Sequence, residues 1–76
     1  MTEKELLKRV GLRIKQLRTE KGLSQADLGI EIDVEKSNVS RMESGKFNTK
    51  ILTLFKVAKA LDLTLPELLK IEKEKS

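Results

Sequence analysis

Three Ser or Thr residues that stand before apolar stretches of helical period are each followed, three positions later, by an acidic residue, and this spacing limits the fold more than any other feature. The pairs are Thr2 and Glu5, Ser24 and Asp27, and Thr64 and Glu67. In a capping box of this kind the hydroxyl accepts a hydrogen bond from the third backbone N–H, and the acidic side chain accepts one in return. Each pair therefore predicts the start of an α-helix within a chain of 76 residues.

Apolar residues repeat every three or four positions after these starts, as they do on the buried face of an α-helix. Helices are predicted over 2–22, 24–32, 35–45, 50–61 and 64–71. The predicted inward residues are Leu6, Leu7, Val10, Ile14 and Leu17 in the first helix, Leu28 and Ile32 in the second, Val39, Met42 and Glu43 in the third, Ile51, Leu54, Phe55, Ala58 and Leu61 in the fourth, and Leu65, Leu68, Leu69 and Ile71 in the fifth. Since no strand pattern is present, the sequence predicts an all-α fold of five helices.

The composition excludes several classes of protein. With 38% apolar and 37% charged residues, the chain is predicted to fold as one domain over 1–76, with a charged tail over 72–76 that frays. It has no Cys and no His, which removes disulfides, zinc sites and the side chain most used in acid–base catalysis. No enzyme activity, metal or cofactor is therefore predicted. No apolar run approaches the roughly 20 residues of a membrane helix, so we expect a cytoplasmic protein with no membrane partner.

The net charge of +4 is unevenly distributed along the chain. Residues 2–21 carry a net charge of +4, residues 22–34 a net charge of −3, and residues 35–50 a net charge of +2. A basic chain is attracted to polyanions such as nucleic acids. Many solvated helical proteins have a similar charge balance, however, so the net charge alone does not identify a nucleic-acid-binding protein. Sequence motifs are needed to decide this.

The predicted helix over 36–44 has a strongly polar outer face. Projected at about 100° per residue, it has Val39, Met42 and Glu43 on one side, Ser37, Ser40, Arg41 and Ser44 on the other, and Lys36 at its exposed start. Short hydroxyl side chains allow a helix to enter a DNA major groove, and Arg can donate two hydrogen bonds to guanine. An ordinary solvated helix has the same pattern, but here another helix ends about three residues earlier, which is the spacing of a helix-turn-helix. Gly29 supplies the small residue that a close crossing of these helices needs.

Three segments follow the pattern of a known family: IKQLRTEKGLSQADLG, VEKSNVSRMESGK and LFKVAKALDLTLPELL. Over about residues 12–69 the chain resembles the phage repressor and Cro-like helix-turn-helix regulators, also called the xenobiotic-response-element (XRE) type. The resemblance implies a five-helix lambda-repressor-like fold, with the helix-turn-helix at about 24–44. It also implies that the partner is double-stranded DNA, bound by a homodimer at an inverted-repeat operator, with no small-molecule ligand. The dimer seam would lie at the end of the fourth helix and on the fifth.

The resemblance also assigns roles to individual residues. The base-reading residues would be Lys36, Ser37 and Arg41, with Ser40 and Asn38 beside them, and the DNA backbone would be held by Gln25, Ser24, Lys46 and Asn48. Relatives often bury an ion pair whose positions correspond to Arg18 and Glu43. The inward position of Glu43 in the projection agrees with this.

Four residues depart from the family pattern. Asp33 stands where the turn usually has a Gly with positive φ, a conformation that Asp tolerates better than most residues do. Glu35 replaces the usual Ser or Thr cap and would bring negative charge close to the phosphates. Phe47 and Leu52 are apolar where relatives are commonly polar, and the sequence leaves open whether they pack locally, form a dimer seam or touch the DNA sugar edge.

Two other interpretations remain open at this stage. The segment KELLKRVGLRIKQLR is a basic amphipathic helix of the kind that lies on membrane surfaces, although Gly11 and the lack of aromatic anchors disfavour this. The same fold also serves antitoxins and adaptors that hold a protein partner. Among DNA-binding members, the sequence does not separate phage repressors, restriction-modification controllers and antitoxins, nor a repressor from an activator.

Overall fold

The computed structural model describes residues 1–71, and in this part of the chain every regular element is a helix. The five helices are α1 (Glu3–Glu20), α2 (Gln25–Ile32), α3 (Lys36–Glu43), α4 (Ile51–Ala60) and α5 (Leu65–Leu68). The predicted all-α, five-helix fold is confirmed. The prediction of a fraying tail over 72–76 lies outside the described residues.

The helix starts are stabilised by the caps that the sequence predicts. Ser24 at α2 and Thr64 at α5 each form a complete capping box with the acidic residue three positions later. Backbone and hydroxyl hydrogen bonds from Ser24 lower the pKa of the Asp27 carboxyl, and those from Thr64 lower the pKa of Glu67 in the same way. At α1 the Thr2 hydroxyl accepts from the Glu5 N–H at 3.1 Å. All three predicted helix starts are therefore present.

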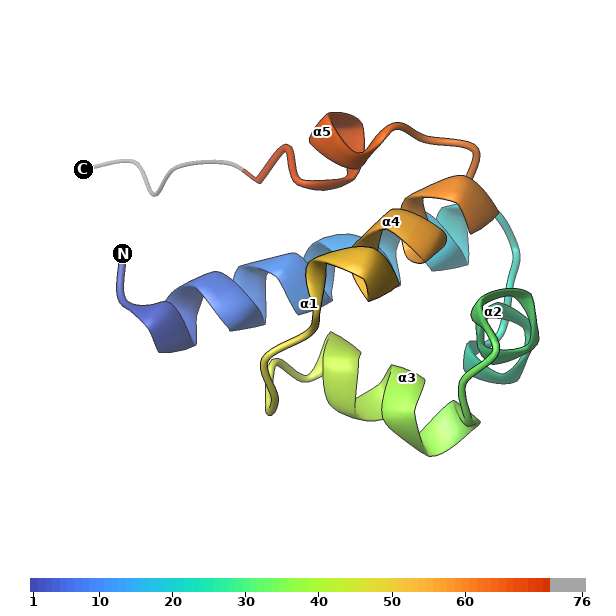
Figure 1. Ribbon diagram of the computed structural model, residues 1–76, viewed down its shortest axis with the longest axis horizontal. Coiled ribbons are helices and arrows are strands. Elements are labelled where there is room, and N and C mark those ends of the chain that lie inside the picture. The colour runs from blue at the N-terminus through green and yellow to red at the C-terminus, as the bar shows by residue number, and fades with distance from the viewer. Residues whose placement is uncertain (72–76) are drawn as a thin grey trace.

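The core lies where the shorter helices meet the long helix α1 (Figure 1). α3 packs against both α1 and α2, α2 also packs against α4, and α4 packs against α5. The buried apolar residues are Ile14, Leu28, Ile32, Val39, Met42, Leu54, Val57, Ala58, Leu61 and Leu68. This arrangement packs α3 against α1 and α2 and leaves the other side of α3 exposed.

The prediction for the buried face of α4 was partly wrong. Ile51 and Phe55 were expected to point inward but are 58% and 48% exposed, whereas Val57, which was not predicted, is completely buried. α4 is apolar over most of its surface, so two overlapping stripes have a helical period, one beginning at Ile51 and one at Leu54. Packing against α2 and α5 selects the second stripe.

Two further expectations need correction. Leu6 was predicted to be buried but is exposed, because the first turns of α1 extend past the other helices (Figure 1). The fifth helix was expected to reach Ile71, but α5 ends at Leu68 after four residues. The guanidinium of Arg13 donates to the carbonyl oxygens of Glu67 and Leu68, at 3.0 and 3.3 Å. The Glu67 oxygen also accepts from the Lys70 N–H at 3.3 Å, and Arg13 supplies a donor to the Leu68 oxygen that a further helical turn would otherwise supply.

Candidate nucleic-acid interface

The turn between α2 and α3 is built from a left-handed residue and a close backbone approach. Asp33 adopts φ 60° and ψ 47°, so Asp takes the positive φ that the turn needs in place of Gly. The Val34 N–H donates to the Gly29 carbonyl at 2.9 Å. A Cβ placed on Gly29 would lie 2.6 Å from the Val34 carbonyl oxygen, which is too close for any other residue. Gly29 and Asp33 together fix the angle between the two helices.

α3 has the two faces that the helical projection predicts. Its buried residues are Val39, Met42 and Glu43, and its exposed residues are Lys36, Ser37, Asn38, Ser40 and Arg41, followed by Ser44. All five residues predicted to read bases therefore lie on the solvent-exposed part of one helix. Glu35 precedes them as an N-cap whose side chain makes no capping hydrogen bond.

A buried ion pair joins α1 to the end of α3. Arg18 donates to both carboxylate oxygens of Glu43, from Nε at 2.6 Å and from Nη2 at 2.9 Å. Its third nitrogen, Nη1, donates to the Leu23 carbonyl at 2.7 Å. The hydrogen bonds to Glu43 raise the pKa of Arg18, although burial acts in the opposite direction. Arg18 therefore holds α3 against α1 as a fixed cation.

Glu43 also fixes the side chain of Gln25 at the start of α2. The Gln25 amide nitrogen donates to Glu43 Oε1 at 3.1 Å. An amide NH2 has two hydrogens, so the second remains available for a group outside the protein. Beside it, the Ser24 hydroxyl accepts from the Asp27 N–H at 3.0 Å. The two residues predicted to hold the DNA backbone at α2 are thus both positioned by the fold.

Two cations that the sequence analysis missed lie beside α3. A Cβ on Gly11 would be 2.4 Å from the Glu43 carbonyl oxygen, so the backbones of α1 and α3 touch there. This contact brings Lys8 and Lys15 to a depression of about 300 Å³, whose other lining residues are Leu12, Gln25, Ser40, Glu43 and Ser44. The two lysines are seven positions apart on one face of α1, with Gly11 between them. That spacing around a Gly could have revealed them.

The loop after α3 carries the remaining predicted contacts. Lys46 and Asn48 are exposed, whereas Phe47 between them is half-buried and packs against the core. The Arg41 guanidinium lies over the Phe47 ring, 5.6 Å from its centre. Leu52, at the start of α4, is 71% exposed. Local packing therefore accounts for Phe47 but not for Leu52.

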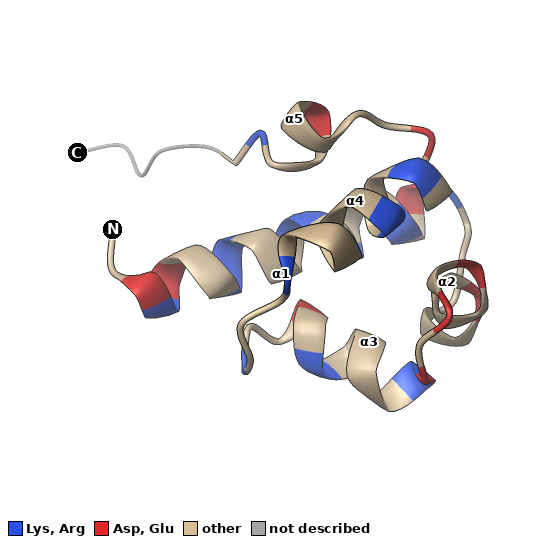
Figure 2. Cartoon of the chain, in the orientation of Figure 1, with Lys and Arg blue, Asp and Glu red and all other residues tan. Residues whose placement is uncertain are grey.

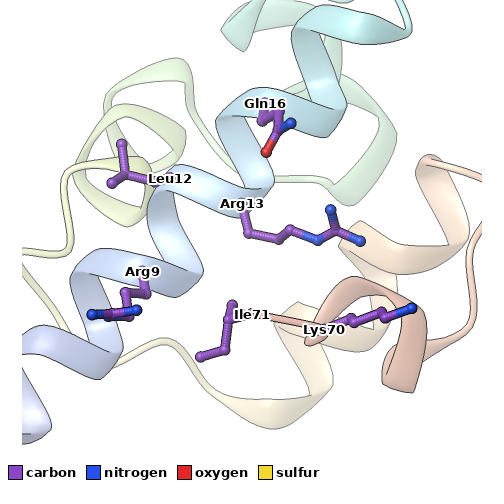
Figure 3. Close-up of a pocket in the computed structure, with 6 residues that line it drawn as sticks. All are labelled: Arg9, Leu12, Arg13, Gln16, Lys70 and Ile71. Atoms are coloured by element: carbon purple, nitrogen blue, oxygen red, sulfur yellow. The ribbon is translucent and has the colours of Figure 1, made fainter. Parts of the chain in front are cut away.

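The distribution of charge differs between the helices. Figure 2 shows basic residues along α1 and at both ends of α3, and acidic residues on α2 and the turn that follows it. A second hollow, of about 500 Å³, is lined by Arg9, Leu12, Arg13, Gln16, Lys70 and Ile71 (Figure 3). It shares only Leu12 with the depression beside α3. It therefore belongs to another part of the α1 surface.

Within residues 1–71 no group of three His, Cys, Asp or Glu residues is arranged to hold a metal ion. No helix in this part of the chain is long and apolar enough to cross a membrane.

Comparison with known proteins identifies similar chains of similar length. A family model described as Helix-turn-helix matches residues 14–68. The control protein C.MunI from a Mycoplasma species is 41% identical over 68 residues, which are 87% of this chain and 92% of that protein.

Solved structures give the same result. The restriction-modification controller protein C.AhdI from Aeromonas hydrophila is 39% identical, with a TM-score of 0.78 over 84% of this chain and 96% of that one. The master regulator for biofilm formation SinR, solved in complex with DNA, is 40% identical, with a TM-score of 0.74 over 80% of this chain and 98% of that one. These neighbours have the lambda-repressor-like fold that the sequence predicts.

Proposed function

Because the chain belongs to the XRE-type helix-turn-helix family of DNA-binding regulators, we propose that it regulates transcription by binding an inverted-repeat operator as a homodimer. The proteins of this family are regulators and not enzymes. In each subunit α3 enters the major groove. Two copies place their α3 helices about one helical turn apart, at ~34 Å, so the half-sites of the operator have this spacing.

The observation that carries the proposal is the exposed face of α3. Its outer side chains are short hydroxyl and amide groups with one Lys at the start and one Arg near the end. Such a face allows the helix backbone to approach base edges, which larger side chains would prevent. Lys36, Ser37 and Arg41 read bases, with Ser40 and Asn38 beside them.

The residues around α3 hold the sugar-phosphate backbone. Gln25 and Ser24 bind phosphate at the start of α2, where the first backbone N–H groups of the helix also favour an anion. Lys46 and Asn48 bind on the other side of α3. These contacts fix the orientation of α3 without reading the sequence.

The homodimer is supported by apolar residues that the monomer leaves exposed. Ile51, Leu52 and Phe55 lie on the first two turns of α4 and have large exposed fractions, although all three are apolar. The family resemblance places the seam at the end of α4 and on α5. The exposed side chains favour the start of α4 instead, so we place the seam there.

The relatives favour one class of regulator. C.MunI and C.AhdI are controller proteins, and this chain covers more than nine-tenths of the length of each. A controller of a restriction-modification system is therefore the class we propose. SinR, a regulator of biofilm formation, is equally similar in sequence, so the genes next to the operator will decide between them.

Selection from a random duplex library with the purified protein tests the proposal. Enrichment of an inverted repeat with half-sites one turn apart is the expected result. Binding without enrichment, with a steep dependence on salt, would indicate non-specific DNA binding. No DNA binding at all would favour an antitoxin or adaptor, in which the same surface holds a protein partner.

A further inference from the structure

The contact between Arg41 and Phe47 joins the two parts of the molecule that face the DNA. Arg41 lies on the exposed side of α3, and Phe47 lies in the loop that follows. Their separation of 5.6 Å, measured from the guanidinium carbon to the ring centre, is within the range of a cation–π interaction. The sequence does not predict this contact. Phe47 lies six positions after Arg41 and α3 ends between them, so the helical period does not determine on which side of α3 the ring lies.

Phe47 is held firmly enough to act as a support. Its ring is half-buried and packs against the core. The loop backbone is also tied to the last turn of α3, since the Lys46 N–H donates to the Arg41 carbonyl at 3.2 Å and the Ser44 hydroxyl donates to the same oxygen at 2.9 Å. The ring and the Arg41 backbone are therefore parts of one rigid frame.

The geometry leaves the donors of Arg41 available. The cation–π contact places the Arg41 guanidinium over the Phe47 ring, and a guanidinium carries five N–H donors. Within the described part of the chain the Arg41 side chain donates no hydrogen bond to a protein group. The ring therefore restrains the position of the guanidinium without taking up a hydrogen-bond acceptor.

We propose that Phe47 is a positioning residue that orients the Arg41 guanidinium for base reading and thereby sets the preference at one operator base pair. The inference rests on the proposed function, and it gives Phe47 a role that acts through Arg41 and not through contact with DNA. An Arg without this support has to be ordered on binding, which weakens its discrimination between bases.

Two variants of Phe47 separate the ring from its packing. Phe47→Leu keeps an apolar side chain against the core but removes the ring, and Phe47→Tyr keeps a ring that can hold a cation. Arg41→Ala first identifies the base pair that Arg41 reads, which is the pair whose preference this variant abolishes. The measurement is then the ratio of the affinity for the preferred operator to the affinity for an operator changed at that base pair. Phe47→Leu should lower this ratio about two- to fivefold, the value of an exposed cation–π contact, and Phe47→Tyr should retain it. Because no phosphate contact is lost, the salt dependence of binding should stay the same in both.

The Arg41→Ala background provides the matched control. There Phe47→Leu should leave the affinity for the preferred operator unchanged, because the side chain that it orients is absent. If Phe47→Leu leaves the ratio unchanged in the wild-type background, the inference is wrong and the proposed function is not affected. If Phe47→Leu still lowers the affinity for the preferred operator in the Arg41→Ala background, the inference is also wrong, since Phe47 would then touch the DNA directly. If the wild-type protein prefers no sequence, the proposed function fails and this inference fails with it.

Discussion

Removing Arg18 should destabilise the fold more than any other single change to a charged residue. Arg18→Ala eliminates two hydrogen bonds to Glu43 and one to the Leu23 carbonyl. It leaves the Glu43 carboxylate with only the Gln25 amide as a partner, in a place where the side chain is 3% exposed. An unpaired buried charge of this kind costs about 3–5 kcal/mol.

This loss is large compared with the stability of such a small domain. At about 0.05–0.15 kcal/mol per residue, a chain of this length has a free energy of unfolding of about 4–11 kcal/mol. A loss of 3 kcal/mol alone lowers the melting temperature by about 12 °C or more. We therefore expect Arg18→Ala to lose a large fraction of its free energy of unfolding, and its unfolding by urea should show the loss directly.

Two matched variants test the reasoning. Lys21→Met breaks the exposed pair between Lys21 and Asp62, whose side chains are 37% and 83% exposed, and should cost about 0–1 kcal/mol. The double variant Arg18→Met, Glu43→Leu removes both charges and should recover most of the stability, because no charge is left buried alone. If Arg18→Ala costs no more than Lys21→Met, or if the double variant is as unstable as Arg18→Ala, the charge is not the cause.

Three further predictions address the DNA surface, the dimer and the caps. Lys8→Gln and Lys15→Gln should each reduce the slope of log affinity against log salt concentration by about 0.9, the value of one phosphate contact. The control Lys21→Gln should leave this slope unchanged. Equal slopes in all three variants would show that α1 does not touch DNA. Leu52→Glu should convert the dimer to a monomer in sedimentation equilibrium while its circular dichroism still shows the folded helices, and its melting temperature should no longer depend on protein concentration. Ile30→Glu, exposed on α2, should leave the dimer intact; a Leu52→Glu protein that remains dimeric would place the seam elsewhere. Because the caps lower the pKa values of Asp27 and Glu67 in the folded state, they stabilise the fold above the ordinary carboxyl pKa, and this contribution is lost as the pH falls below about 4. Urea unfolding at pH 6, 4 and 3 should show this loss of stability in the wild type, and a smaller loss in the double variant Asp27→Asn, Glu67→Gln.

The candidate site was predicted more completely than the core. The outward side of α3 follows from its helical period alone, and the positive φ of Asp33 agrees with the family resemblance, in which the turn usually has a Gly at that position. The base-reading roles of Lys36, Ser37 and Arg41 stay predictions, because no contact with DNA has been measured. Lys8, Lys15 and the support of Arg41 by Phe47 were missed, since each depends on a packing contact between separate segments.

The sequence by itself determined where the helices begin and which side of α3 faces solvent. A cap connects residues three positions apart, and a helical period repeats within a few residues. Both features are therefore local and do not depend on contacts between helices. Only the tertiary structure decided which apolar stripe of α4 is buried, where α5 ends and what surrounds Arg41. Packing against α2 and α5 selects the buried stripe of α4, Arg13 of α1 donates to the carbonyl oxygens at the end of α5, and a ring in the loop after α3 lies against Arg41. These outcomes depend on contacts between distant parts of the chain, which no local pattern records.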